Sequence, residues 1–355
     1  MSIVIAILIF ALVILIHEIG HFSAAKLFKM RVYEFSLGMG PALIKKRVKE
    51  TTYSIKAIPF GGSVQLGEDN EGSDDPLCFR NRPIWQRTIV IMAGAIMNIV
   101  LGFFLCLIIV MMYEKVDTNV IRGFREGATS YQQLRTGDEI ISINGMRIFT
   151  WADISYQFYN TELKLSDDAD VAFFDFDVKR DNERLHLYNV PFRAEIREDG
   201  VSGIFVDFGI EFVDKTFFNV IARAGKDTIS FSRLILLTLF DMFKGTYRLN
   251  DISGPVGVVS AIGEVSSKGF KEGLIEGIRS SLIMAALITI NVGIFNLLPI
   301  PALDGAKIVF FMIEAVRRKP IKAEIEGAIH FVGFAALMLF MLVITVLDIG
   351  KLFNG

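Results

Sequence analysis

The chain has 355 residues, of which 52% are hydrophobic, and its formal net charge at pH 7 is -2. Its mean hydropathy of +0.47 lies well above that of soluble proteins, so the composition predicts a membrane protein. The charge balance and the lack of a long basic block argue against nucleic acid as a partner. The two cysteines, Cys78 and Cys106, fit neither a disulfide framework nor a CxxC metal site, so we expect unpaired thiols.

Four stretches have the length and apolarity of membrane-spanning helices: residues 3–27, 88–113, 280–298 and 329–349. The first stretch lacks a basic n-region and a cleavage site, so we expect it to stay as a helix. Lysine and arginine are frequent in the loop before the second span and in the turn before the fourth. The positive-inside rule therefore predicts that both loops are cytoplasmic and that both termini and the long middle segment lie outside.

The first span contains the sequence HEIGH, in which His17, Glu18 and His21 form an HExxH pattern. Positions i and i+4 share one face of a helix, so the two imidazoles could hold one zinc ion with Glu18 beside its open position. This arrangement is typical of peptide hydrolysis, with the glutamate as general base. The alternative is a structural role, with histidines bonded to neighbouring helices. Because an ionisable residue at bilayer depth costs about 2.5–3.5 kcal/mol on insertion scales, three in one helix favour a functional site.

The loop 28–87 contains the alternating run TTYSIKAIPF, followed by Gly61 and Gly62. This pattern predicts a β-hairpin that dips toward the membrane and whose edge strand could pair with an unwound substrate. An ordinary cytoplasmic hairpin with a glycine turn is the alternative.

The middle segment begins with a separate domain, expected over residues 114–212. GDEIISINGMRI, residues 137–148, predicts a strand, a turn at Asn144 and Gly145, and a second strand. Further strand-like runs, VAFFDFDV, LHLYNV and GIFVDFGI, complete a small mixed domain. Residues 213–279 follow as a linker, whose apolar part is interrupted by charges and therefore predicts an amphipathic helix on the membrane surface.

A catalytic zinc usually takes three protein ligands, so one remains to be found. His186 lies in the outer domain and His330 at the edge of the last span. Asp304 in NLLPIPALDG is the stronger candidate, because it returns to the side where the first span ends. It could instead cap the helix that begins at Gly305.

The third span carries two asparagines, Asn291 and Asn296. They could bond the backbone of a loosened substrate, or join helices within the bundle.

Together, HEIGH, the single GDEIISINGMRI domain and NLLPIPALDG resemble the site-2 protease family of intramembrane zinc metalloproteases, in its bacterial regulator-of-sigma-E protease branch. The resemblance implies Zn²⁺ held by His17, His21 and Asp304, a membrane-reentrant β-hairpin, and a PDZ-like outer domain. It also implies substrate contacts by Asn291, Asn296, Gly61 and Gly62, and it includes GAIMNIVLG, whose Asn98 we expect to be structural. The chain departs from the family where Asp304 is followed by Gly305-Ala306-Lys307, since relatives often have a second glycine and a histidine there.

We therefore expect a polytopic α-helical membrane protein with four transmembrane helices, a reentrant hairpin and one extracytoplasmic PDZ-like mixed α/β domain. Its predicted parts are residues 1–113, 114–212, 213–279 and 280–355. The expected activity is zinc-dependent cleavage within transmembrane segments of single-span membrane proteins, such as an anti-sigma factor or remnant signal peptides. The expected location is the bacterial plasma membrane, with the active site toward the cytoplasmic side.

The outer domain would then either bind a newly exposed C-terminus or exclude bulky substrates. A non-catalytic PDZ scaffold is the alternative function. A metal transporter is disfavoured, because the second and fourth spans are nearly free of ionisable residues.

Overall fold

The structure is a computed structural model that describes residues 2–66, 75–163, 170–196, 202–246 and 253–354. It divides into two compact units. One joins Met1–Leu105 with Tyr247–Gly355, and the other is Cys106–Thr246. Both cysteines are buried, and neither forms a disulfide in the described part of the chain.

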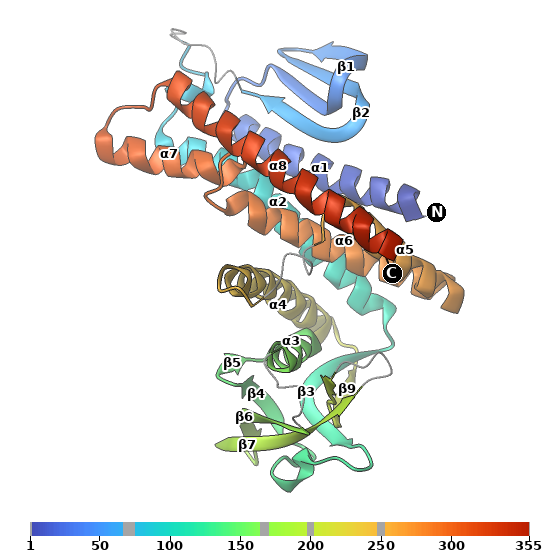
Figure 1. The fold of residues 1–355 in the computed structure, drawn as a ribbon. Helices are drawn as coiled ribbons and strands as arrows, with labels where there is room; N and C mark the ends of the chain where they lie inside the picture. The colour runs from blue at the N-terminus through green and yellow to red at the C-terminus, as the bar shows by residue number, and fades with distance from the viewer. Residues whose placement is uncertain (1, 67–74, 164–169, 197–201, 247–252, 355) are drawn as a thin grey trace. The chain divides into compact units, whose positions relative to one another are not determined.

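The first unit is a bundle of long helices (Figure 1). Within the described residues, four helices are long and apolar enough to cross a membrane, as the sequence predicts: α1 (Ser2–Leu27), α2 (Ile84–Met112), α6 (Leu274–Leu297) and α8 (Ala323–Asn354). Helices α2, α6 and α8 begin four to six residues before the predicted spans, because polar residues continue each helix ahead of its apolar part. The described part of this unit also contains α5 (Pro255–Glu272), α7 (Asp304–Arg317) and a 3-10 turn (Phe79–Asn81).

Small residues bring α1 and α2 together. A Cβ atom at Gly20 would lie 2.4 Å from the Ala93 carbonyl oxygen, so only glycine allows this close approach. This contact positions the HEIGH turn of α1 directly against α2.

The predicted hairpin is formed by β1 (Glu34–Val48) and β2 (Thr51–Gln65). Both strands bend, so that residues 34–37 pair with residues 52–55 on one side and with residues 62–65 on the other. Residues 62–65 therefore form one edge of this small sheet. Phe22 of α1 packs edge-on against Phe35, with ring centroids 5.3 Å apart, which fixes the hairpin on the first span.

The second unit contains an antiparallel sheet with strand order β8-β7-β6-β4-β3-β9, in which β5 pairs with β4. In chain order its elements are β3 (Lys115–Phe124), a 3-10 turn (Ser130–Gln132), β4 (Glu139–Ile143), β5 (Met146–Arg147), α3 (Trp151–Glu162), β6 (Val171–Arg180), β7 (Glu183–Ile196), β8 (Ser202–Ile204), β9 (Phe208–Asp214) and α4 (Phe217–Phe243). The predicted Asn144-Gly145 turn joins β4 to β5, with φ of 48° and 77° at the two residues. Isoleucines and phenylalanines make up most of the buried core, and Phe158 of α3 stacks on Phe174 of β6.

The expected linker 213–279 contains α4 in the second unit and α5 in the first. The polar residues that interrupt the apolar pattern of α4 bind the rest of the second unit. Arg223 pairs with Asp117, and the Ser230 hydroxyl donates to Asp153 Oδ1 at 2.5 Å. The opposite face exposes large apolar side chains: Phe217, Phe218, Ile229, Leu236, Phe240 and Phe243.

Candidate metal centre

The structure brings together the side chains that the sequence singles out at opposite ends of the chain. His17 and His21 lie one turn apart on α1, and Asp304 is the first residue of α7. Asp304 Oδ2 lies 3.0 Å from His17 Nε2 and 3.2 Å from His21 Nε2, and the two Nε2 atoms are 3.1 Å apart. Three ligand-type atoms thus form a nearly equilateral triangle.

This donor set fits zinc. Two imidazoles and one carboxylate are ligand types that catalytic zinc sites use. Ligand atoms bound at about 2.0–2.1 Å in a tetrahedron lie roughly 3.3 Å from one another, close to the edges of the observed triangle. Among the described residues, this trio is the one cluster of histidine, cysteine or acidic side chains close enough to hold a metal ion.

Each imidazole also has a polar neighbour on α2. The Nδ1 of His21 bonds the Val90 carbonyl oxygen at 2.8 Å, which places a proton on Nδ1 and leaves the Nε2 lone pair for a metal. The Nδ1 of His17 lies 3.4 Å from the side-chain nitrogen of Asn98, a fully buried residue. Turning the Asn98 amide would let its oxygen accept from His17 Nδ1–H in the same way.

Glu18 lies beside the triangle and is largely buried, with 9% of its surface exposed. Gly62, on the edge segment of the hairpin, lies directly against it. A Cβ atom at position 62 would be 2.7 Å from Glu18 Cγ and 3.2 Å from Oε1. The edge strand therefore passes across the carboxylate, whereas Gly61, with φ of +83°, would direct a side chain toward Met39.

Gly94 of α2 is a residue that the sequence analysis missed. A Cβ atom there would lie 2.5 Å from His21 Nε2 and 2.8 Å from His17 Cε1. The two rings fit against α2 only because this position has no side chain. A glycine inside an apolar helix was the available signal, since such a residue usually has a packing or functional reason.

The other predicted residues do not belong to the triangle. Asn291 is exposed and Asn296 half-buried, and within the described residues no hydrogen bond joins either to His17, His21 or Asp304. His186 bonds Asp177 in the second unit. His330 accepts a hydrogen bond from the Ala302 backbone, just before Asp304.

Comparisons with known proteins agree with this geometry. The chain matches the family model described as Peptidase family M50 over residues 5–340. A Fusobacterium nucleatum protein, named provisionally as a zinc metalloprotease, is 34% identical to this chain over an alignment of 366 residues. The alignment covers 100% of both chains. The regulator of sigma-W protease RasP of Bacillus subtilis is 29% identical over 430 residues, and the zinc metalloprotease RasP of Shouchella clausii is 29% identical over 429, each with 98% of both chains covered.

The family match spans the HEIGH helix, the hairpin and the Asp304 segment alike, so the likeness is not confined to one motif. It confirms the resemblance to site-2 proteases and the expectation of Zn²⁺ as cofactor. This chain is therefore a membrane-embedded zinc metalloendopeptidase that belongs to peptidase family M50.

Proposed function

We propose that the protein hydrolyses peptide bonds within the transmembrane segments of single-span membrane proteins, with His17, His21 and Asp304 as zinc ligands and Glu18 as general base. The observation that carries this proposal is the triangle of three donor atoms with a buried glutamate beside it. The triangle unites residues 287 positions apart in sequence, which a chance HExxH pattern would not do.

Zinc bound there would supply a Lewis acid that lowers the pKa of a coordinated water to about 7. The Glu18 carboxylate would act as general base toward the attacking water and, once protonated, as general acid toward the leaving amine. Val90 and Asn98 would keep the two imidazoles in the tautomer that presents Nε2. The largely buried position of Glu18 limits the water around the reacting bond.

A helical substrate must be unwound before its backbone can be cut, and each amide exposed in lipid costs several kcal/mol. We propose that the reentrant hairpin compensates for this cost, since residues 62–65 form a sheet edge that an extended substrate could join. The contact between Gly62 and Glu18 would place such a strand at the general base. Gly61 would shape the same edge, while Asn291 and Asn296 would bond the loosened substrate backbone.

We further propose that both termini and the second unit, as a PDZ-like domain, lie outside the bacterial plasma membrane, with the metal centre toward the cytoplasmic side. The basic residues of the loop 28–87 and of the turn before α8 support this orientation. The exposed apolar face of α4 supports contact with the bilayer surface. The name of the Bacillus relative, a regulator of sigma-W protease, favours a role in regulated proteolysis. We propose an anti-sigma factor as substrate, or remnant signal peptides.

The test is Glu18→Gln in the purified full-length chain, reconstituted in detergent with zinc and a model single-span substrate. We expect cleavage to fall about 10²–10⁴-fold while zinc content stays at the wild-type level. Glu264→Gln, an exposed residue of α5, is the matched control and should cleave normally. Undiminished cleavage by Glu18→Gln would overturn the proposed mechanism.

A further inference from the structure

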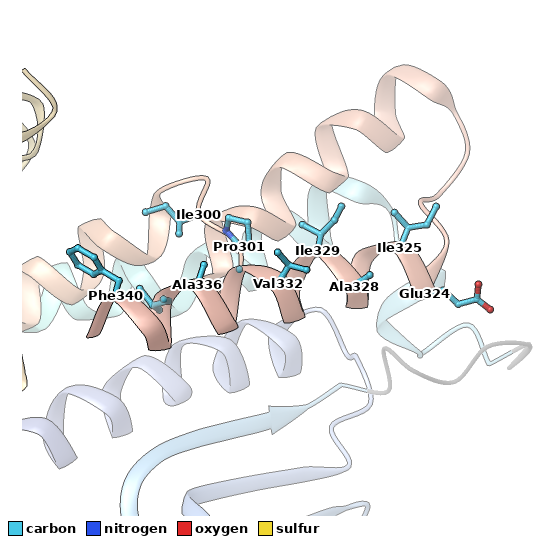
Figure 2. Close-up of a pocket in the computed structure, with 11 residues that line it drawn as sticks. Ile300, Pro301, Glu324, Ile325, Ala328, Ile329, Val332, Ala336 and Phe340 are labelled. Carbon is cyan, nitrogen blue, oxygen red and sulfur yellow. The ribbon is translucent and has the colours of Figure 1, made fainter. Parts of the chain in front are cut away.

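The last span makes a direct hydrogen bond to the segment that precedes Asp304. The Ala302 backbone N–H donates to His330 Nδ1 of α8 at 3.1 Å. Figure 2 shows the neighbouring residues Ile300 and Pro301 beside the face of α8 that carries Val332 and Ala336. A side chain 26 residues beyond Asp304 thus supports the backbone two residues before it.

Ala302 needs this support. Its φ of +76° lies in the left-handed region that residues other than glycine rarely adopt. A residue in this region is strained and persists only where its surroundings hold it. Bonds within the loop join Ile300 N to Leu298 O at 2.7 Å and Leu303 N to Ile300 O at 3.1 Å, whereas the Ala302 N–H is directed to α8.

The position of His330 is itself well defined. Its ring packs edge-on against Phe310 of α7, with centroids 5.5 Å apart. Gly333, one turn further along the same face of α8, lies so close to the loop that a Cβ atom there would be 2.1 Å from Pro301 Cβ. Helix α8 therefore contacts the loop at two adjacent points, one polar and one by close packing.

The loop is in turn packed tightly under the start of α7. A Cβ atom at Gly305 would lie 2.0 Å from the Leu298 carbonyl oxygen, so the loop and the first turn of α7 have little room to move separately. A shift of Ala302 is therefore transmitted to Asp304. A displacement of about 1 Å at a reacting centre is enough to cost roughly 10²-fold in rate.

We infer that His330 is a positioning residue, whose Nδ1 holds the Ala302 backbone and so sets the Asp304 carboxylate against the two imidazoles. His330 acts as a hydrogen-bond acceptor and not as a ligand. This inference rests on the proposed role of Asp304 in zinc binding. Outer-shell partners of metal ligands typically contribute about 10–100-fold to metal affinity.

Three substitutions separate the acceptor from the ring. His330→Asn keeps a hydrogen-bond acceptor at the δ position but removes the ring. His330→Phe keeps a ring beside Phe310 but removes the acceptor. His330→Gln moves the acceptor to the ε position. The full-length chain is stripped of metal and its zinc affinity is measured by competition with a chromophoric chelator, together with cleavage of a model substrate. Phe331→Leu, at an exposed neighbouring position, is the control.

We expect His330→Phe and His330→Gln to weaken zinc binding about 10–100-fold, with His330→Asn and Phe331→Leu close to the wild type. Wild-type zinc affinity in His330→Phe, or an equal loss in all three His330 variants, would overturn the inference. Asp304→Asn is measured in parallel. If both His330→Phe and Asp304→Asn bind zinc with wild-type affinity, the proposed ligand set is wrong. If Asp304→Asn loses zinc while His330→Phe binds it normally, only the role of His330 is wrong.

Discussion

Gly94 of α2 lies directly beside the His21 imidazole, where a Cβ atom would come within 2.5 Å of Nε2. Gly94→Ala must therefore displace one or both rings from the triangle. We expect zinc affinity to fall about tenfold or more, with a parallel loss of cleavage. The measurement is chelator competition on the metal-free, full-length chain.

Gly225→Ala in α4 is the matched control, because a Cβ atom there meets nothing within 4 Å. It should leave zinc binding unchanged. Normal zinc affinity in Gly94→Ala would show that the rings have more freedom than this packing implies.

Gly62→Ala tests the contact between the hairpin edge and Glu18, the proposed general base. A methyl group there would press on Glu18 Cγ, 2.7 Å away, and its three nearest atoms all belong to Glu18. We expect the turnover number to fall about 10²-fold, the cost of a displacement near 1 Å, while zinc affinity is retained. Gly209→Ala, at an open position of β9, should cleave normally. A loss of zinc from Gly62→Ala would instead place the hairpin in metal binding.

Asp348, near the end of α8, holds the start of α5. This buried carboxylate, 4% exposed, accepts hydrogen bonds from Gly254 N at 2.9 Å and Gly257 N at 2.8 Å. Asp348→Ala leaves both donors without this partner at the positive end of a helix, so we expect a loss of about 1–3 kcal/mol in the free energy of unfolding. Thermal unfolding in detergent measures it.

Lys351→Ala removes the more exposed partner of Asp348, 3.7 Å away, and should change stability by only about 0–1 kcal/mol. If Asp348→Ala and Lys351→Ala lower the free energy of unfolding equally, Asp348 stabilises the protein through its ion pair with Lys351 and not through the start of α5.

Stability of the second unit should depend on pH through Asp177. The Ser142 hydroxyl, His186 and Arg184 all donate to this carboxylate and hold its pKa well below the usual 3.8. A lowered folded-state pKa adds stability that is fully present above the unfolded-state value and is lost as the pH falls toward the lower folded value. Acidification below 3.8 should therefore destabilise this region.

Asp177→Asn should lower the melting temperature of the full chain at pH 7, and its difference from the wild type should shrink below pH 3.8. Asp214→Asn, whose side chain is 91% exposed, should show little difference at either pH. A difference between Asp177→Asn and the wild type that does not change with pH would contradict this account.

The sequence predicted the elements that depend on local rules. Helical spacing alone places His17 and His21 on one face, and apolar length alone identifies the four spans. Asp304 was different, because the sequence left a helix cap as an alternative and the resemblance to a family favoured a ligand. No local rule joins residues 287 positions apart, and the contact arises from packing of α7 against α1 and α2.

Residues that act through close packing could not be predicted from the sequence for the same reason. Gly94 and Gly62 matter because of what lies opposite them, which the sequence does not encode locally. Likewise, the charges in α4 predicted an amphipathic helix but not its partners, and in the structure Arg223 and Ser230 bind Asp117 and Asp153 of the same unit. Alternation of polar and apolar residues identifies the two faces of a helix without saying what covers either one.

The central claim is one zinc ion held by two imidazoles from α1 and a carboxylate from α7. X-ray absorption at the zinc edge, recorded on the purified zinc-loaded chain, tests it most directly. The account predicts two imidazole ligands and oxygen neighbours, all at about 2.0–2.1 Å. A sulfur neighbour at about 2.3 Å, or a spectrum without the scattering of two imidazoles, would contradict it.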